Sequence, residues 1–155
     1  MKVSIVMGSK SDLDLAKAAG EILDTLDVPY TINILSAHRT PELLHAHIDE
    51  AIADGVRVFI GIAGLAAHLA GNVASKTTLP VIGVPGDGGP LNGFDALLST
   101  VQMPKGVPVG CLAIDGAFNA GILAASIISN FDTKVKSNLE RWRRLQTQSI
   151  KKKPK

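Results

Sequence analysis

The sequence predicts a doubly wound α/β domain, in which helices cover both faces of a parallel sheet. Five apolar runs of strand length recur along the chain, at residues 2–7, 29–35, 57–62, 80–84 and 107–114. Most of these runs lack a strict alternation of apolar and polar residues, as expected of strands that are buried on both faces. Helix-length segments separate the runs, so right-handed crossovers between parallel strands are expected.

The first two strands are each followed by a segment with helical periodicity. One face of the first segment collects apolar residues: Leu15, Ala18, Ala19, Ile22, Leu23 and Leu26. One face of the second does the same: Leu44, Ile48, Ala51 and Ile52. Asp12 is the predicted N-cap of the first helix. Thr40, followed by Pro41 and Glu42, predicts the start of the second, and Gly55 marks its end.

The C-terminal segment differs from the rest of the chain. Residues 132–150 form a charged helix with one narrow apolar stripe: Val135, Leu139, Trp142 and Leu145. Packing on a neighbouring subunit is one use of this stripe, and packing on its own domain is the other. We therefore expect a catalytic α/β domain over residues 1–131, an amphipathic helix over 132–150 and a disordered basic tail over 151–155.

Composition limits the possible functions. The 155 residues suit one domain, and 46% of them are apolar but only 4% aromatic, which predicts an aliphatic core. Seven of the 16 basic residues lie in the last fifteen positions with only Trp142 beside them, which argues against a nucleic-acid surface. The N-terminal apolar run is too short for a signal peptide or a membrane span, so a cytoplasmic protein is expected. Cys111 is the single cysteine, which excludes a disulfide within the chain.

Ligands of doubly wound domains bind beyond the carboxyl ends of the strands, where the loops GSKSD (8–12), SAHRT (36–40), AGLAAH (63–68) and PGDGGPLNG (85–93) should meet. GSKSD precedes a helix N-terminus and suits a phosphate, although simple helix capping by its serines is an equal alternative. Its Asp12 could cap the helix or accept hydrogen bonds from ribose hydroxyls. No Walker loop or GxGxxG motif is present, which disfavours ATP and dinucleotides.

The SAHRT corner is more informative about chemistry. Ser36 and Arg39 can both face an anion, while His38 can titrate near neutral pH. His68 is either a second polar group in the same pocket or a cap of the short helix 66–75. The other two histidines, His45 and His47, read as surface or packing residues. Without carboxylate partners the four histidines do not predict a metal site.

Six blocks carry a family resemblance: MGSKSD (7–12), SAHRTP (36–41), AAHL (66–69), KTTLPVIGVP (76–85), LNGFDALLSTVQMP (91–104) and NAGILAA (119–125). With them the chain resembles the class I PurE family, the N5-carboxyaminoimidazole ribonucleotide mutases of bacterial purine biosynthesis. The resemblance implies a flavodoxin-like three-layer αβα sandwich that assembles as a homo-octamer with active sites at subunit junctions. It also implies no metal or organic cofactor, and a nucleotide substrate whose carboxylate moves from an exocyclic nitrogen to a ring carbon through enclosed carbon dioxide.

The same resemblance implies roles for individual residues. Ser9, Ser11, Ser36 and Arg39 correspond to the phosphate-binding positions, and Asp12 to the ribose-binding position. His38 corresponds to the proton carrier and His68 to the second active-site histidine. The remaining substrate-binding positions that the resemblance implies are Gly8, Ala37, Gly64 and Leu69.

The chain departs from the family pattern in its third loop. Where the family has GAGGAAHLPG, this chain reads IAGLAAHLAG (62–71), so Ile62, Leu65 and Ala70 replace Gly, Gly and Pro. The glycine of the family pattern suits an unusual backbone conformation that would be costly for Leu65, so the geometry of this loop stays open. The next loop, GDGGPLNG, is richer in glycine than the family pattern, which transfers flexibility to that neighbour.

Alternative functions remain open from the sequence. The second class of the family carboxylates aminoimidazole ribonucleotide directly with free carbon dioxide, but it tends to carry lysine where this chain has Arg39. A non-catalytic nucleotide-sensing module of flavodoxin type is a second alternative. A flavin-binding electron carrier is a third, which the scarcity of aromatic residues in the loops disfavours.

Overall fold

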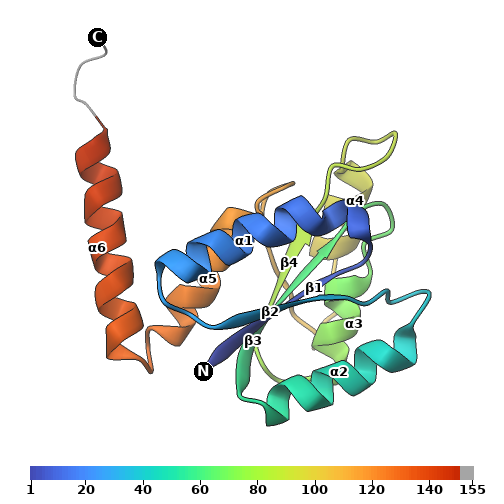
Figure 1. The fold of residues 1–155 in the computed structure, drawn as a ribbon. Helices are drawn as coiled ribbons and strands as arrows, with labels where there is room; N and C mark the ends of the chain where they lie inside the picture. The colour runs from blue at the N-terminus through green and yellow to red at the C-terminus, as the bar shows by residue number, and fades with distance from the viewer. Residues whose placement is uncertain (151–155) are drawn as a thin grey trace.

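A parallel sheet of five strands lies at the centre of the computed structural model, which describes residues 1–150 (Figure 1). The strands are β1 (Lys2–Met7), β2 (Tyr30–Ile34), β3 (Val56–Ala63), β4 (Val81–Pro85) and β5 (Gly110–Cys111). Their spatial order is β2-β1-β3-β4-β5, and every pairing is parallel. This is the flavodoxin-like order. Ligands of such folds bind at the topological switch point, which here lies between the carboxyl ends of β1 and β3.

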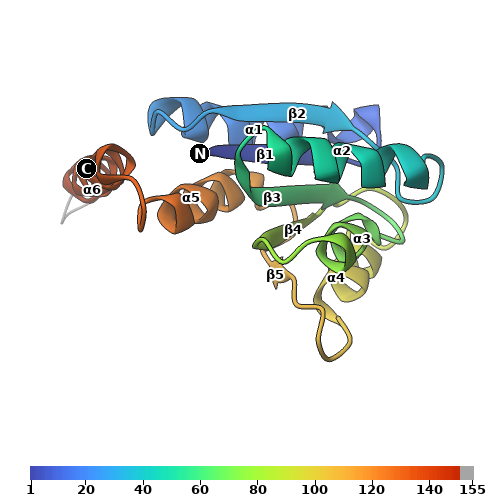
Figure 2. The same cartoon turned by 90° about the horizontal axis from the view of Figure 1, so that it is seen from below.

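Helices cover both faces of this sheet, which confirms the predicted three-layer sandwich (Figures 1 and 2). On one face lie α1 (Leu13–Thr25) and α5 (Ala117–Ile128), whose apolar residues form one core cluster with β1, β3 and β4. On the other lie α2 (Pro41–Ala53) and α3 (Leu69–Lys76), which form a second cluster. Helix α4 (Phe94–Val101) packs beside α3 over β4 and β5. The sheet is therefore buried on both sides around β1, β3 and β4.

Two of the predicted strands are less buried or shorter than the apolar runs suggested. Strand β2 is an edge strand with partly exposed residues along its length, because it has a neighbour on one side only. Strand β5 covers two residues of the predicted run 107–114. Pro108 has no backbone N–H for a ladder hydrogen bond, which explains why pairing begins after it.

The C-terminal helix, α6 (Thr133–Ser149), uses its first half to pack on its own domain. Val135 and Leu139 are buried in the α1/α5 core cluster, and the Trp142 ring lies 6.1 Å from the ring of Phe118. Leu145, the last residue of the predicted stripe, is 58% exposed. The first part of the stripe thus follows the own-domain alternative, while the far end of α6 points away from the sheet (Figure 1).

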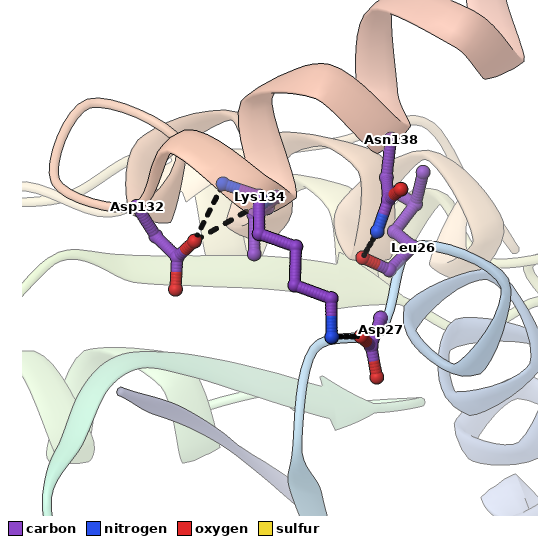
Figure 3. A network of polar contacts seen from close by, with 6 residues as sticks. Leu26, Asp27, Asp132, Lys134 and Asn138 are labelled. Carbon is purple, nitrogen blue, oxygen red and sulfur yellow. Dashed lines mark hydrogen bonds and ion pairs between the residues drawn. The ribbon is translucent and has the colours of Figure 1, made fainter.

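Polar contacts fix the start of α6 against the turn between α1 and β2 (Figure 3). The Asp132 carboxylate accepts hydrogen bonds from the backbone N–H groups of Lys134 and Val135, at 3.0 and 3.1 Å, and so caps the helix. The Lys134 side chain forms an ion pair with Asp27, and Asn138 donates a hydrogen bond to the carbonyl of Leu26 at 3.1 Å. The predicted helix over residues 132–150 agrees with the observed α6, while the predicted basic tail lies outside the described residues.

A partly buried polar contact joins β1 to α2 far from the strand-end loops. The hydroxyl of Ser4, which is fully buried, lies 2.9 Å from Nε2 of His47. Burial lowers the pKa of His47 below its usual range, and the nearby Glu50 carboxylate opposes this only in part. Of the two alternatives for His47, a surface or a packing residue, this contact selects the packing residue.

The lowered pKa of His47 predicts a loss of stability in acid. Between about pH 6.5, where an unperturbed histidine titrates, and the lower pKa of the folded state, the unfolded chain binds more protons than the folded one. The contribution of His47 is therefore complete above about pH 6.5 and falls as the pH falls through this window. Urea unfolding at pH 8, 6.5 and 5 will show a smaller decline for His47→Gln, which keeps a polar partner for Ser4 without titrating. An equal decline in both proteins would contradict this assignment.

None of the helices within residues 1–150 combines the length and the apolar character that crossing a membrane requires.

Candidate active site

All four predicted loops open into one cavity of about 630 Å³ at the carboxyl ends of β1 to β4. This volume is typical of sites for small molecules. Every predicted site residue lines it: Gly8, Ser9, Ser11, Asp12, Ser36, Ala37, His38, Arg39, Gly64, His68 and Leu69. Five lining residues were not predicted: Ala63, Leu65, Ala66, Gly88 and Gly89. The cavity lies beyond the carboxyl ends of the strands, as predicted for this fold. The loops meet there because β1 to β4 are adjacent and parallel in the sheet.

The first loop is built by a capping box rather than by a side-chain cap from Asp12 to α1. A 3₁₀ turn (Lys10–Asp12) separates β1 from α1, and Ser9 is its N-cap, accepting a hydrogen bond from the Ser11 N–H at 3.2 Å. Asp12 reaches back instead, so that its Oδ2 accepts from the Ser9 N–H at 3.0 Å. Asp12 occupies the N-cap position of α1, as predicted, but its side chain makes no cap hydrogen bond to that helix. Asp12 is the third residue of the 3₁₀ turn. From that position a carboxylate can accept a hydrogen bond from the backbone N–H of the N-cap residue, here Ser9.

The same geometry sets the electrostatics of Asp12. Partial burial raises the pKa of its carboxyl above the usual range, while the hydrogen bonds from Ser9 and Ser11 oppose that rise. The hydrogen bond from the Ser9 N–H uses one lone pair of Oδ2, and the carboxylate keeps further lone pairs that can accept a hydrogen bond from a ligand hydroxyl. The hydroxyls of Ser9 and Ser11 are hydrogen-bonded to each other at the cavity wall. The capping interpretation of Ser9 is thus correct, and it still presents a hydroxyl to the cavity.

The second loop holds Arg39 in a fixed position. Its backbone N–H and Nε donate to the Ser36 hydroxyl at 3.2 and 3.3 Å, and its Nη2 donates to the carbonyl of Gly8 at 3.0 Å. The guanidinium therefore bridges the loops after β2 and β1. Thr40 closes this loop by accepting from the Ser36 N–H at 2.9 Å and donating to the Ser36 carbonyl at 3.1 Å. Helix α2 begins at Pro41 as predicted, but the Thr40 side chain stabilises the loop instead of capping the helix.

A pair of histidines joins the second loop to the third. His38 Nε2 lies 2.8 Å from His68 Nδ1, and the two rings meet edge to face at 80° with centroids 5.0 Å apart. Such a hydrogen bond needs an N–H on one ring and a lone pair on the other, so the two facing nitrogens share one proton. His68 occupies the N-cap position of α3 but makes no side-chain cap. Of its two alternatives, the structure selects the polar group in the pocket.

The third loop has an unusual backbone conformation at Leu65. Its φ is +56°, in the left-handed region, where a residue with a side chain is disfavoured by roughly 1–2 kcal/mol. Ser99 of α4 supports the loop, because its hydroxyl accepts a hydrogen bond from the Ala67 N–H at 2.9 Å. The other two departures from the family pattern are buried, Ile62 in the core of β3 and Ala70 in α3.

Thr40 and Ser99 are structural supports of the site that the sequence analysis missed. Thr40 was interpreted only as a helix start, and Ser99 lies 34 residues from Leu65, on a helix that received no role. The supporting role of Thr40 has a sequence signal, because a hydroxyl residue directly before a helix that begins with proline often hydrogen-bonds to the preceding turn. Nothing in local sequence indicates the role of Ser99. Within residues 1–150, no three histidine, cysteine or acidic side chains are arranged to hold a metal ion.

Comparisons with known proteins agree with this geometry. The family model described as AIR carboxylase matches residues 2–149. The chain is 50% identical to an N5-carboxyaminoimidazole ribonucleotide mutase of Aliivibrio fischeri, over 99% of this chain and 97% of that protein. The protein of that name from Bacillus subtilis is also 50% identical, over 96% and 93% of the two chains. Among solved structures, Treponema denticola PurE superimposes with a TM-score of 0.88 at 31% identity, covering 96% of this chain and 92% of its own.

The flavodoxin-like sheet and the polar cavity at its carboxyl edge define an α/β enzyme that acts on a small molecule. The match over residues 2–149 and the identities of about half then decide its family. The chain belongs to the AIR carboxylase family.

Proposed function

We propose that this chain converts N5-carboxyaminoimidazole ribonucleotide to 4-carboxy-5-aminoimidazole ribonucleotide in purine biosynthesis, and is therefore an isomerase of the mutase type. Relatives that bear the name of this mutase match nearly the whole chain. The observation that carries the proposal is the hydrogen-bonded pair of His38 and His68, which lies in the same cavity as an arginine and three serine hydroxyls. One part of that cavity suits a phosphate, and the other suits a group that exchanges a proton.

The phosphate belongs with the first two loops. Ser9, Ser11 and Ser36 supply hydroxyls, and Arg39 is the one arginine or lysine among the lining residues of the described chain. Hydrogen bonds from a guanidinium to a phosphate are charge-assisted and geometrically specific. The ribose then lies within reach of the Asp12 carboxylate, and the aminoimidazole ring extends toward His38.

The reaction exchanges one proton for another around a transfer of carbon dioxide. The bond between the exocyclic nitrogen and the carboxylate carbon breaks, its electron pair stays on nitrogen, and that nitrogen takes up a proton. The ring carbon, which is enamine-like, attacks the released carbon dioxide, and a carbon–carbon bond forms. The proton on that carbon then leaves, so the sum of the steps is an isomerisation.

His38 is placed to carry this proton. A single imidazole that first donates to nitrogen and later accepts from carbon returns to its starting state, and general acid–base catalysis of this kind contributes about 10²- to 10⁴-fold. His68 holds the His38 ring through the bond between Nε2 and Nδ1. This bond couples the tautomers of the two rings, because only one of the facing nitrogens carries the proton. The ring carbon is itself the electron source, so we propose that no metal or organic cofactor takes part. Holding carbon dioxide beside that carbon supplies a proximity effect worth up to about 7–11 kcal/mol.

An assay with two substrates tests this proposal against direct carboxylation. The purified protein should convert the carbamate substrate to the carboxylated ribonucleotide without added bicarbonate. It should use aminoimidazole ribonucleotide with labelled bicarbonate poorly. Efficient use of the second pair together with no use of the carbamate would overturn the mutase assignment. Binding of nucleotide with no turnover of either would favour a sensor.

We also propose that the protein acts in the cytoplasm as a homo-octamer with sites at subunit junctions. Large apolar side chains stand exposed on and before α4: Leu91, Phe94, Leu98 and Val101, each between 47% and 63% exposed. Such a patch supports association. The far end of α6, with Leu145, is a second surface that a neighbouring subunit could cover.

A further inference from the structure

The cavity has two parts that differ in polarity. The loops after β1 and β2 contribute the serine hydroxyls, Asp12 and Arg39. The loops after β3 and β4 contribute only apolar side chains and glycine, apart from His68: Ala63, Gly64, Leu65, Ala66, Leu69, Gly88 and Gly89. Because His38 comes from the polar part and His68 from the apolar part, their hydrogen bond marks the boundary.

Leu65 stands out in the apolar part. It lines the cavity although its side chain is 54% exposed, and the left-handed backbone at this residue sets the direction in which the side chain leaves the loop. Its Cδ2 lies directly over Gly89, so closely that a Cβ at position 89 would overlap it. Gly89 also has a φ of +94°, a conformation that glycine adopts without strain. The Leu65 side chain thus occupies the space that a side chain at position 89 would need.

The surrounding backbone keeps these two residues together. A Cβ on Gly64 would lie 3.7 Å from the carbonyl oxygen of Gly86, so the third and fourth loops run in near contact. Ser99 holds the third loop from behind through the Ala67 N–H. The isobutyl group of Leu65 consequently forms the wall of the cavity where these loops meet.

We propose that Leu65 is a positioning residue that, packed on Gly89, closes the apolar part of the cavity and retains carbon dioxide between its release and its recapture. This inference rests on the proposed function. Carbon dioxide is small, uncharged and without a dipole, so an apolar wall holds it near the ring carbon while offering no hydrogen bonds to competing water. If the molecule escapes, aminoimidazole ribonucleotide is left behind. Recapture from solution would then bring in carbon from the bicarbonate pool.

The test measures this escape directly. Unlabelled carbamate substrate is converted in buffer that contains ¹³C-bicarbonate and carbonic anhydrase, and ¹³C in the product carboxylate is counted together with released aminoimidazole ribonucleotide. Two variants are compared with the parent protein, Leu65→Gly and Leu65→Asn. Both replacements tolerate the left-handed backbone, so each can fold, and the second keeps much of the volume while removing the apolar character. Leu43→Asn is the matched control, because Leu43 is 61% exposed and does not line the cavity.

We expect both Leu65 variants to raise label incorporation and release by about tenfold per turnover, the change that corresponds to losing roughly half of one leucine's apolar burial. Leu43→Asn should match the parent protein. Label at the parent level in either folded Leu65 variant would overturn the role of Leu65. A parent protein that converts no carbamate would instead refute the proposed function, so the two failures are distinguishable.

Discussion

Replacing His38 by asparagine will abolish turnover of the carbamate substrate and leave nucleotide binding in place. Asparagine cannot donate and accept a proton in one cycle, so the rate should fall by about 10²- to 10⁴-fold, the usual contribution of a general acid–base group. Asparagine is too short to replace Nε2 in the 2.8 Å contact with His68, but the hydrogen bonds of Arg39 and Thr40 to Ser36 still hold the loop. The cavity should therefore keep its shape.

The measurement combines steady-state kinetics with calorimetric titration of the product nucleotide. His45→Asn is the matched control, because His45 lies on α2 and does not line the cavity. A His38→Asn protein that retains more than a small part of the activity would remove His38 from the proton-carrying role. Loss of binding together with turnover would show that the residue acts in structure instead.

Replacing Arg39 by glutamine should raise KM strongly and change kcat less. A hydrogen bond to a charged group is worth about 1.5–3 kcal/mol, which predicts a rise of roughly 10- to 150-fold if the guanidinium binds the substrate phosphate. The ring that reacts lies at the other part of the cavity, so bound substrate should still react. Arg39→Lys should fall between the two proteins, because an ammonium cannot form a two-pronged contact with phosphate.

The inhibition constant of inorganic phosphate is an independent measurement of the proposed contact between Arg39 and the substrate phosphate. Inhibition should weaken in Arg39→Gln in parallel with the rise in KM. Arg57→Gln is the control, since Arg57 lies at the start of β3, at the opposite end of the strands from the cavity, and its side chain donates a hydrogen bond to the carbonyl of Val56. An unchanged KM in Arg39→Gln would place the phosphate elsewhere in the cavity.

Much of the fold could be predicted because burial leaves a periodic trace in the sequence. The run KVSIVM became β1 with the same bounds, since it is central and buried on both faces. The run 107–114 was less informative, because apolar residues near Pro108 resemble a strand even where proline prevents pairing. Partial exposure of β2 depends on its place at the edge of the sheet, which only the three-dimensional order decides.

The lining of the cavity could also be predicted, but its internal contacts could not. Strand order places successive loops at one edge, so residue type and position were enough to select His38 and Arg39. The bond between His38 and His68 joins residues thirty positions apart and depends on how two loops turn. The capping box of Ser9 and Asp12 has the sequence pattern S-x-x-D and was predictable, whereas the separate 3₁₀ turn that it begins, before α1, was not.

The shared space of Leu65 and Gly89 makes the order of mutations matter. A chain that acquires a side chain at position 89 while leucine is present meets a steric overlap and an unfavourable backbone conformation at once. The same change after leucine has been replaced by glycine meets only the second obstacle. Substitutions at the two positions are therefore epistatic, because a side chain at position 89 displaces the Leu65 side chain only while leucine is present.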